Sequence, residues 1–248
     1  MRTTQRLDKV LSNFGFGTRS KIRQLVKDGA VRVDGEAVTD GGMQIDPQSC
    51  TIDVYGEVLN YRKFIYIMMN KPAGVISATE DSRQRTVLDI LPEKYSCFGL
   101  FPAGRLDVDT EGLLLLTNDG QLAHEILSPK KHVPKRYYAL IDGMVGQYAM
   151  ECFKSGVVLN DGYKTMPAEL YIIMSGEQNS EIELVLHEGK FHQVKRMFEA
   201  IGRKVTYLKR IKIGGLELDN RLAPGDCREL TAEETGLLKA LPEMNINE

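Results

Sequence analysis

Four consecutive leucines, Leu113 to Leu116, constrain the fold of this chain more than any other stretch of its sequence. A charged loop containing Asp107 precedes the run, and an Asn-Asp-Gly turn signal follows it. The apolar run is too short to indicate a helix and is typical of a strand buried on both faces. We therefore expect Asp107 to lie just outside a rigid core strand, where a side chain is aimed more accurately than on a free loop.

The composition indicates a globular protein that can bury a full core, with 248 residues, 42% of them hydrophobic and 27% charged. No apolar run approaches the roughly 20 residues that span a bilayer, and the N-terminus lacks the apolar core of a signal peptide. We therefore expect a cytoplasmic protein, and a monomer. The four cysteines are scattered without a C-x-x-C pair, which suggests neither a zinc site nor a disulfide framework.

The first 30 residues are basic, although the whole chain has a formal net charge of −2. They hold seven lysines and arginines against two aspartates, an asymmetry typical of a phosphate-binding part, although such a run can also be a solvated helix face. Apolar spacing predicts helices over 6–14 and 19–28, the second capped by Thr18 and ended by Gly29. An Asp-Gly turn predicts a hairpin over 31–38. We expect a small α+β domain with its linker over 1–60 and a large domain over 61–248.

Three segments of this small domain resemble the S4 RNA-binding domain: Arg6 to Leu11, Thr18-Arg19-Ser20, and Gly29 to Gly35. In that family the paired basic helices lie against structured RNA. Lysine and arginine suit phosphate contacts because RNA carries one negative charge per nucleotide. The resemblance implies RNA contacts by Arg6, Lys9, Arg19, Ser20, Arg23 and Arg32.

The rest of the chain is rich in strand patterns. Runs of apolar and β-favouring residues predict strands over 51–54, 64–69, 113–116, 135–141, 157–159, 168–173, 182–186 and 204–213. Helices are predicted over 86–91, 121–127, 149–154 and 191–201, and Thr231 with Glu234 forms the capping-box pattern of a last helix. We expect an α+β fold, with a large, mostly antiparallel mixed sheet and flanking helices.

Asp107 taken alone would be a surface or turn carboxylate, but its neighbours follow a family pattern. Gly104-Arg105-Leu106-Asp107-x-x-Thr110-x-Gly112, followed by the leucines and Thr117, is similar to the signature of the RsuA/RluB/RluE/RluF family of pseudouridine synthases. Three other segments agree with that family in the same order: Asn70-Lys71-Pro72-x-Gly74, Lys135-x-Tyr137, and Glu188 to Met197. The resemblance implies the pseudouridine synthase fold for the large domain.

The same resemblance implies roles for the site residues. The aspartate of the signature is the catalytic residue of that family, and here it is Asp107. Tyr137 is the active-site tyrosine, and Lys195 stands where many relatives have the arginine that pairs with the aspartate. Lysine keeps the charge but lacks the planar fork, which puts a bidentate pair in doubt. Further RNA contacts are implied for Arg105, which would support the opened RNA, and for Lys71 and Arg196.

Each of these residues also has a purely structural interpretation. Tyr137 could be a core tyrosine with its hydroxyl at the surface, and Lys195 and Arg196 could belong to a solvated helix face. His187 and His192 lack metal-ligand spacing and fit packing or RNA-adjacent positions better. The occurrence of the motifs together and in order favours the enzyme.

The resemblance implies that a specific uridine of ribosomal RNA, flipped out of its helix or loop, becomes pseudouridine. This isomerisation needs no cofactor, and the sequence has no P-loop, dinucleotide fingerprint or metal cluster. The segment His192 to Met197 is closer to the type acting on 16S (small-subunit) rRNA than to the type acting on 23S (large-subunit) rRNA, which remains an alternative. A non-catalytic S4-type rRNA-binding or ribosome-assembly factor is the rival from another class, but it would have no use for the Asp107 loop. The expected partner is ribosomal RNA or a pre-ribosomal particle.

Overall fold

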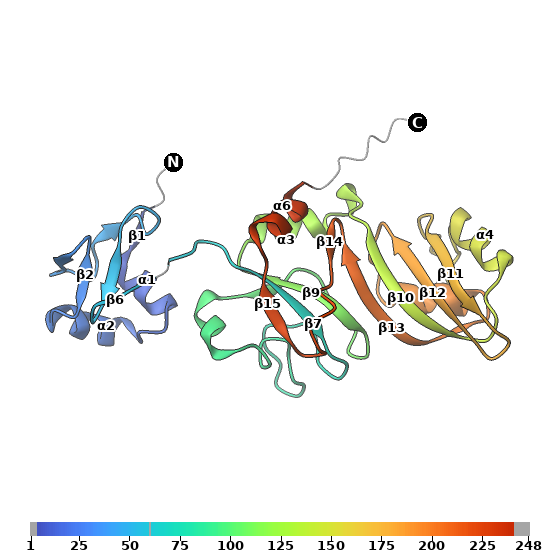
Figure 1. Cartoon of the computed structure of the whole chain (residues 1–248), viewed down its shortest axis with the longest axis horizontal. Coiled ribbons are helices and arrows are strands. Elements are labelled where there is room, and N and C mark those ends of the chain that lie inside the picture. Colours follow the sequence, from blue (N-terminus) through green and yellow to red (C-terminus); the bar gives the residue numbers. More distant parts are fainter. Residues whose placement is uncertain (1–3, 60, 241–248) are drawn as a thin grey trace. The chain divides into compact units, whose positions relative to one another are not determined.

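A computed structural model describes residues 4–59 and 61–240, which form two compact units. The first unit combines the residues up to 65 with residues 91–100, and the second contains residues 66–90 and those from 101 onward. The expected boundary, residue 60, lies outside the described residues. Residues 91–100, which we had assigned to the large domain, cluster with the small unit. Figure 1 draws the elements of both units in the colours of the sequence.

The first unit has two short helices and a small sheet. Its elements are β1 (Gln5–Arg6), α1 (Leu7–Asn13), α2 (Arg19–Lys27), β2 (Val31–Val33), β3 (Glu36–Ala37), β4 (Gln44–Ile45), β5 (Ile52–Val54) and β6 (Glu57–Val58). The strands β3, β2, β5 and β6 form an antiparallel sheet in that order, and β1 pairs with β4. The Thr18 hydroxyl accepts a hydrogen bond from the backbone N–H of Lys21 at 3.4 Å. Both predicted helices, the cap and the hairpin are confirmed.

Residues 91–100 join this unit because their 3₁₀ helix, η1 (Glu93–Phe98), packs against α1. The rings of Phe14 and Phe98 meet edge to face with their centroids 5.5 Å apart. The helix predicted over 86–91 is wrong. Thr86 forms a bridge with Ile76, and the carboxylate of Asp89 accepts hydrogen bonds from the Thr86 backbone N–H and hydroxyl, a local side-chain turn that competes with a helix.

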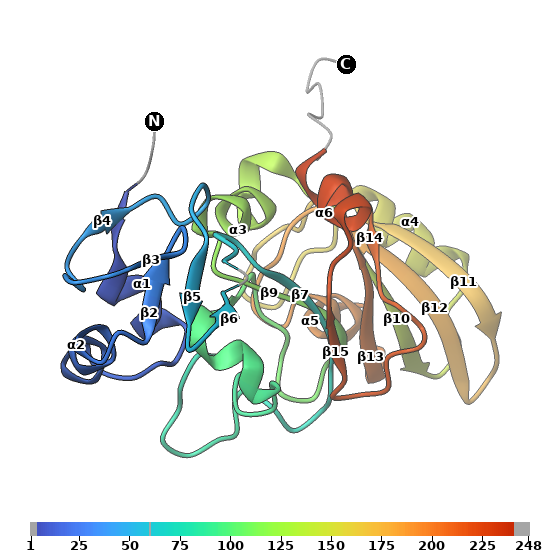
Figure 2. The ribbon, with the colours of Figure 1, turned by 60° about the vertical axis from the view of Figure 1, so that its left-hand side comes forward.

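A nine-stranded mixed sheet forms the second unit. Its strands are β7 (Tyr66–Lys71), β8 (Phe101–Pro102), β9 (Glu111–Thr117), β10 (Lys135–Asp142), β11 (Glu169–Ser175), β12 (Asn179–Leu186), β13 (Lys204–Ile213), β14 (Leu216–Glu217) and β15 (Cys227–Glu229). The order is β11-β12-β10-β13-β9-β7-β15, with β14 on β13 and β8 on β9. Among the strand pairs of the described residues, β9 with β13 is the parallel one, and the others are antiparallel. Figure 2 shows these strands from a second side. The α+β expectation is confirmed.

The leucine run forms most of β9, and Leu113 to Leu116 are each 0% exposed, as expected for a strand buried on both faces. Just before the run, Gly112 has φ of +101° and lies opposite Arg210 of β13. A Cβ at Gly112 would collide with the backbone of Arg210. Glycine is therefore required where the two parallel strands first meet.

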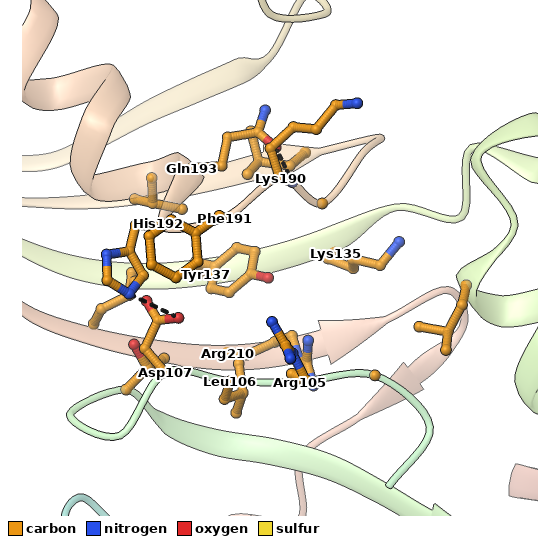
Figure 3. Close-up of a pocket in the computed structure, with 17 residues that line it drawn as sticks. Arg105, Leu106, Asp107, Lys135, Tyr137, Lys190, Phe191, His192, Gln193 and Arg210 are labelled. Carbon is orange, nitrogen blue, oxygen red and sulfur yellow. Dashed lines mark hydrogen bonds and ion pairs between the residues drawn. The ribbon is translucent and has the colours of Figure 1, made fainter. Parts of the chain in front are cut away.

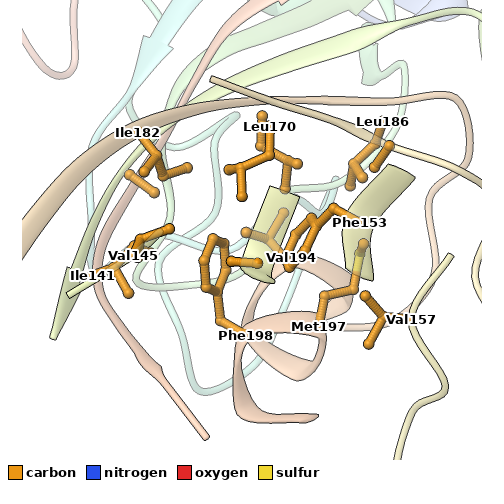
Figure 4. Packing of buried hydrophobic residues seen from close by; sticks show 14 of the residues in the cluster. Ile141, Val145, Phe153, Val157, Leu170, Ile182, Leu186, Val194, Met197 and Phe198 are labelled. Atoms are coloured by element: carbon orange, nitrogen blue, oxygen red, sulfur yellow. The ribbon is translucent and has the colours of Figure 1, made fainter. Parts of the chain in front are cut away.

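The helices of this unit are α3 (Gly120–Leu127), the 3₁₀ helix η2 (Pro129–Lys131), α4 (Gln147–Ser155), α5 (Gln193–Ala200) and α6 (Ala232–Lys239). Phe153 of α4 and Phe198 of α5 have ring centroids 4.8 Å apart and belong to one buried cluster with residues of β10, β11, β12 and β13 (Figure 4). The capping box of Thr231 and Glu234 is confirmed. Of the described helices, none combines the length and apolar character needed to cross a membrane.

Several predicted bounds, and one predicted strand, differ from the structure. α5 begins at Gln193, because His192 has a left-handed backbone with φ of +49°. β7 continues to Lys71, since Pro72 lies beyond the last paired residue and removes no ladder hydrogen bond. The strand predicted over 157–159 is wrong, and only an isolated bridge joins Val158 to Lys164.

Candidate active site

Asp107 lies on the loop between β8 and β9, at a cavity of about 230 Å³ (Figure 3). Its loop is fixed on the preceding side by Ser77, whose hydroxyl donates to the Leu106 carbonyl and accepts from the Leu106 N–H, both at 3.0 Å. The loop, β10, β13 and the segment before α5 supply the lining. The residues lining the cavity include Arg105, Leu106, Asp107, Thr110, Lys135, Tyr137, Lys190, Phe191, His192, Gln193 and Arg210.

Lys71 holds the same loop from inside the protein. Its side chain is 0% exposed, and its ammonium donates to the carbonyls of Thr110 at 2.9 Å, Asp107 at 3.0 Å and Pro72 at 3.0 Å. Burial lowers the Lys71 pKa to about 8. The implied RNA contact of Lys71 finds no support in this position, since the amine is buried away from the cavity lining and its donors are taken by carbonyls. The residue instead anchors the Asp107 loop.

Two basic side chains, Lys195 and His192, approach Asp107 from the start of α5. The Lys195 ammonium is 3.5 Å from one carboxylate oxygen, and His192 Nε2 is 3.5 Å from the other. Lys195 lies closer to Asp109, at 2.6 Å, and that hydrogen bond lowers the pKa of Asp109. The expected partner of Asp107 is therefore shared with Asp109, for which sequence reasoning found no role.

Tyr137 reaches the cavity from β10, where it lies directly opposite Arg210 of β13. In Figure 3 its ring is seen between Asp107 and the ends of Arg105 and Arg210. The ring also packs against the buried cluster behind the sheet. The core interpretation and the site interpretation of Tyr137 are thus both compatible with its position.

Lys135 and Arg210 place two further cations at the cavity, to which sequence reasoning gave no role. Lys135 donates to the Val133 carbonyl at 2.8 Å, and burial, together with the charge of Arg210, lowers its pKa to about 8. Arg210 is 3% exposed, and its Nε donates to the Leu113 carbonyl at 2.8 Å. The sequence does not mark either residue, because Lys135 is followed by Arg136 and β13 also carries Lys204, Lys209 and Lys212.

Glu188 fixes the segment that leads into α5. Its buried carboxylate accepts hydrogen bonds from the Tyr163 hydroxyl at 2.6 Å, the Gln193 amide at 2.7 Å and the Met166 N–H at 3.0 Å. His192, in its left-handed conformation, stacks on the 67% exposed ring of Phe191 with the centroids 3.7 Å apart. A rigid base thus presents an aromatic pair at the rim of the cavity.

Arg105 and Arg196, the other predicted RNA contacts of the large unit, differ in how freely they could contact RNA. Arg105 is exposed and lines the cavity. Arg196 is 25% exposed and forms an ion pair with Asp161, so an RNA phosphate would have to compete with that carboxylate. The structure therefore brings Asp107, Tyr137, Lys195 and Arg105 together and leaves Arg196 beside them.

The six predicted RNA contacts of the small unit are exposed. Arg19, Ser20 and Arg23 lie on α2, Lys9 on α1 and Arg32 on β2. Arg6 is held by the buried carboxylate of Asp8 at 2.7 Å, and this pair lowers the pKa of Asp8. Arg6 therefore already has an anionic partner within the protein, with which an RNA phosphate would have to compete.

Comparison with known proteins gives two family matches. The family model described as RNA pseudouridylate synthase matches residues 65–200, and that of the S4 domain matches residues 5–49. A crystal structure of a pseudouridylate synthase aligns with a TM-score of 0.65 and 37% identity, covering 94% of this chain and 99% of the other.

Three curated bacterial relatives match this chain over almost the whole length of both sequences. The uncharacterized RNA pseudouridine synthase YtzG of Bacillus subtilis is 52% identical, over 94% of this chain and 98% of its own. The ribosomal small subunit pseudouridine synthase A of Vibrio cholerae is 43% identical, over 92% and 97%. The ribosomal large subunit pseudouridine synthase B of Bacillus subtilis is 39% identical, over 98% and 99%.

Proposed function

This chain belongs to the RNA pseudouridylate synthase family, and on that premise we propose that it converts a specific uridine of small-subunit ribosomal RNA to pseudouridine. The observation that carries the proposal is a carboxylate, Asp107, held at the mouth of a cavity that also contains Tyr137 and several cations. We expect the enzyme to act in the cytoplasm as a monomer, on ribosomal RNA or a pre-ribosomal particle.

The reaction breaks the bond between N1 of uracil and C1′ of the ribose, turns the base and joins C5 to C1′. The proton on C5 is released and N1 gains one, so no redox partner is needed. Asp107 can serve as the nucleophile or as the base that removes a ribose proton, and both roles require the ionised carboxylate. The Lys195 ammonium lies 3.5 Å from one oxygen of that carboxylate and offsets part of its negative charge, and His192 lies 3.5 Å from the other oxygen.

Tyr137 and Arg105 are assigned to the base and the opened RNA. The Tyr137 ring would stack on the uracil, which must leave its helix or loop to enter a cavity of this size. Arg105 is exposed at the rim, where its guanidinium would support the strand from which the base has left. Phe191, which is exposed at the same rim, offers a second stacking surface.

The direct test replaces Asp107 with Asn, which keeps the volume of the side chain and removes its charge. We expect no tritium release from RNA labelled at C5 of uridine, with RNA affinity close to that of the parent. A matched control, Asp142→Asn at the end of β10, should leave the rate unchanged. Turnover by Asp107→Asn at the parental rate would overturn the assignment.

RNA binding by the small unit is tested with Arg19→Glu and Arg23→Glu combined, since both side chains are exposed on α2 one turn apart. We expect weaker binding and a shallower dependence of log K on log salt, by about 0.7 to 0.9 for each phosphate that the protein no longer neutralises. Reversal of two exposed lysines of the large unit, Lys154 and Lys204, is the control. If both double variants bound alike, the S4 surface would not be the part that binds RNA.

The choice of subunit rests on the segment from His192 to Met197 and on the higher identity to the small-subunit relative, 43% against 39%. Mapping of pseudouridines in 16S and 23S rRNA from cells with and without this protein decides it. We expect one 16S position to lose its modification. Loss at a 23S position alone would assign the enzyme to the large subunit.

A further inference from the structure

The cavity has a cationic end, and two of its members, Lys135 and Arg210, have no role in the proposed chemistry. Arg105, Lys135 and Arg210 all line it, and in Figure 3 they are seen on the side of Tyr137 away from Asp107. They come from a loop and two neighbouring strands, β10 and β13, whose register places Tyr137 opposite Arg210. The cavity therefore combines a carboxylate at one end with a group of positive charges at the other.

Arg210 is the member of this group that most needs an explanation. It is 3% exposed, and its Nε is bonded to the Leu113 carbonyl. Its Nη2 is buried and has no hydrogen-bond partner among the described residues. A buried guanidinium without an anion is costly, and structures rarely leave such a donor unpaired. The unpaired N–H belongs to a residue that lines the cavity, where a bound ligand could accept its hydrogen bond.

Lys135 adds to the same field. Among the described residues its amine has one acceptor, the Val133 carbonyl, which leaves donors for a ligand because an ammonium carries three N–H bonds. The charge of Arg210 acts on Lys135 and helps to lower its pKa, as expected for two cations that lack an anion between them. No acidic side chain of the described residues forms an ion pair with either of them.

We propose that Arg210 and Lys135, with Arg105 at the rim, form a phosphate subsite that binds a phosphodiester next to the flipped uridine. This inference rests on the proposed function, since it assumes that the ligand is a nucleotide. Arginine and lysine bind phosphate oxygens by charge-assisted hydrogen bonds, and the planar Arg210 can offer its free N–H in a fixed direction.

Such a subsite serves the isomerisation directly. During the reaction the base is detached and turned, while C1′ must stay within reach of Asp107. Holding the phosphate at one end of the cavity fixes the ribose and leaves the base free to turn. The subsite is thus a positioning device, with no part in bond making.

The test compares ligands that differ by one phosphate. Binding of uridine, uridine 5′-monophosphate and uridine 3′-monophosphate to the full-length protein is measured by equilibrium dialysis of the tritiated compounds. We expect one monophosphate to bind at least about ten-fold more tightly than uridine, which is the gain of one charge-assisted hydrogen bond. The preferred isomer tells which side of the target nucleotide is held. Equal affinity for all three compounds would overturn the proposal and leave the uracil carbonyls as the partners of Arg210.

Variants separate the subsite from a general effect of charge. Lys135→Met and Arg210→Met should each reduce the preference for the monophosphate several-fold while uridine binding stays the same, and Arg210→Lys should keep part of it. Lys204→Met, at the exposed beginning of β13, removes the same charge elsewhere and should change nothing. If Arg210→Met does not fold without its bond to Leu113, Lys135→Met decides, because its amine has only one protein acceptor. An unchanged preference in Lys135→Met would then overturn the subsite.

The two proposals fail in different ways. Tritium release from ribosomal RNA by the parent protein tests the reaction, whereas the ratio of monophosphate to uridine affinity tests the subsite without turnover. Pseudouridine formation with equal affinities would refute the subsite alone. A clear preference for the monophosphate in a protein that forms no pseudouridine would refute the proposed reaction alone.

Discussion

Replacement of Lys71 by Met should disable the Asp107 loop without touching the RNA-binding surface. Methionine keeps the length of the side chain and removes three donors, whose carbonyl acceptors lie at 2.9 to 3.0 Å. At about 1.5 to 3 kcal/mol for each hydrogen bond to a charged group, the gross loss is roughly 4 to 9 kcal/mol. Removing the buried ammonium, whose pKa is lowered from 10.5 to about 8, returns about 3 kcal/mol. We expect a net destabilisation of about 1 to 6 kcal/mol.

Two measurements check this expectation. Urea unfolding gives the loss of folding free energy, and single-turnover tritium release gives the rate of the chemical step. The rate should fall by about 100-fold or more, because a displacement of about 1 Å of a reacting group has that effect. RNA affinity should stay within about two-fold of the parent, because Lys71 is 0% exposed. Lys204→Met is the matched control, since it removes an exposed lysine of the same unit.

Two results would refute the reasoning. A folded Lys71→Met protein that reacts at the parental rate would mean that the loop keeps its place without the amine. A loss of RNA affinity with an unchanged rate at saturating RNA would return Lys71 to the role of an RNA ligand at the surface, against its burial in the structure.

Three further changes have definite expected results. Gly112→Ala should lower the midpoint of thermal unfolding by several degrees or prevent folding. The added methyl would collide with the backbone of β13, and the φ of +101° at residue 112 is unfavourable for alanine. A midpoint equal to that of the parent would contradict the close approach of β9 and β13. The pair with Arg228 lowers the pKa of Glu234 from 4.5 to about 2, so the contribution of Glu234 to folding stability is complete above pH 5 and is lost as the pH falls toward 2. Above pH 5 the Glu234→Gln protein should be less stable than the parent by about 1 to 2 kcal/mol after allowance for partial exposure, and urea titrations should show this difference close toward pH 2. A difference that does not depend on pH would exclude this role. Asp109→Asn removes the nearer carboxylate at Lys195 and should leave the lysine to Asp107 alone. Lys195→Met should then lower the rate more in the Asp109→Asn background than in the parent, and equal losses in both backgrounds would show that Asp109 does not compete for Lys195.

Patterns of apolar residues predicted an element well where its residues are buried in the same core. The leucine run of β9 was predicted because it is uninterrupted and short, and the strand Lys204–Ile213 because it is rich in apolar and β-favouring residues. The α2 cap was predicted because Thr18 acts within its own turn. Predictions failed where a side chain competed with the backbone. Asp89 replaced a helix with a local turn around Thr86, and no periodicity reports such a bond.

Sequence motifs identified individual residues of the site, but they did not predict how those residues interact with one another. The RNA contact of Lys71 was implied by the family resemblance of its motif, whereas its burial depends on a loop 36 residues further on, which a local motif does not report. Lys195 was expected at Asp107 but is also held by Asp109, since two carboxylates of one loop compete for it. Arg210 was not singled out, because its unpaired N–H exists only when β9, β10 and β13 are assembled.

The parallel pairing of β9 with β13 also determines when this protein can begin to work. Synthesis proceeds from the N-terminus, so Asp107 and the leucine strand leave the ribosome long before the strand that carries Arg210. Until β13 arrives, Glu111 and Gly112 of β9, which follow the Asp107 loop, lack their strand partners Lys209 and Arg210. The cavity cannot close around a nucleotide in such a nascent chain. The site around Asp107 is therefore complete only after residue 210 has been synthesised.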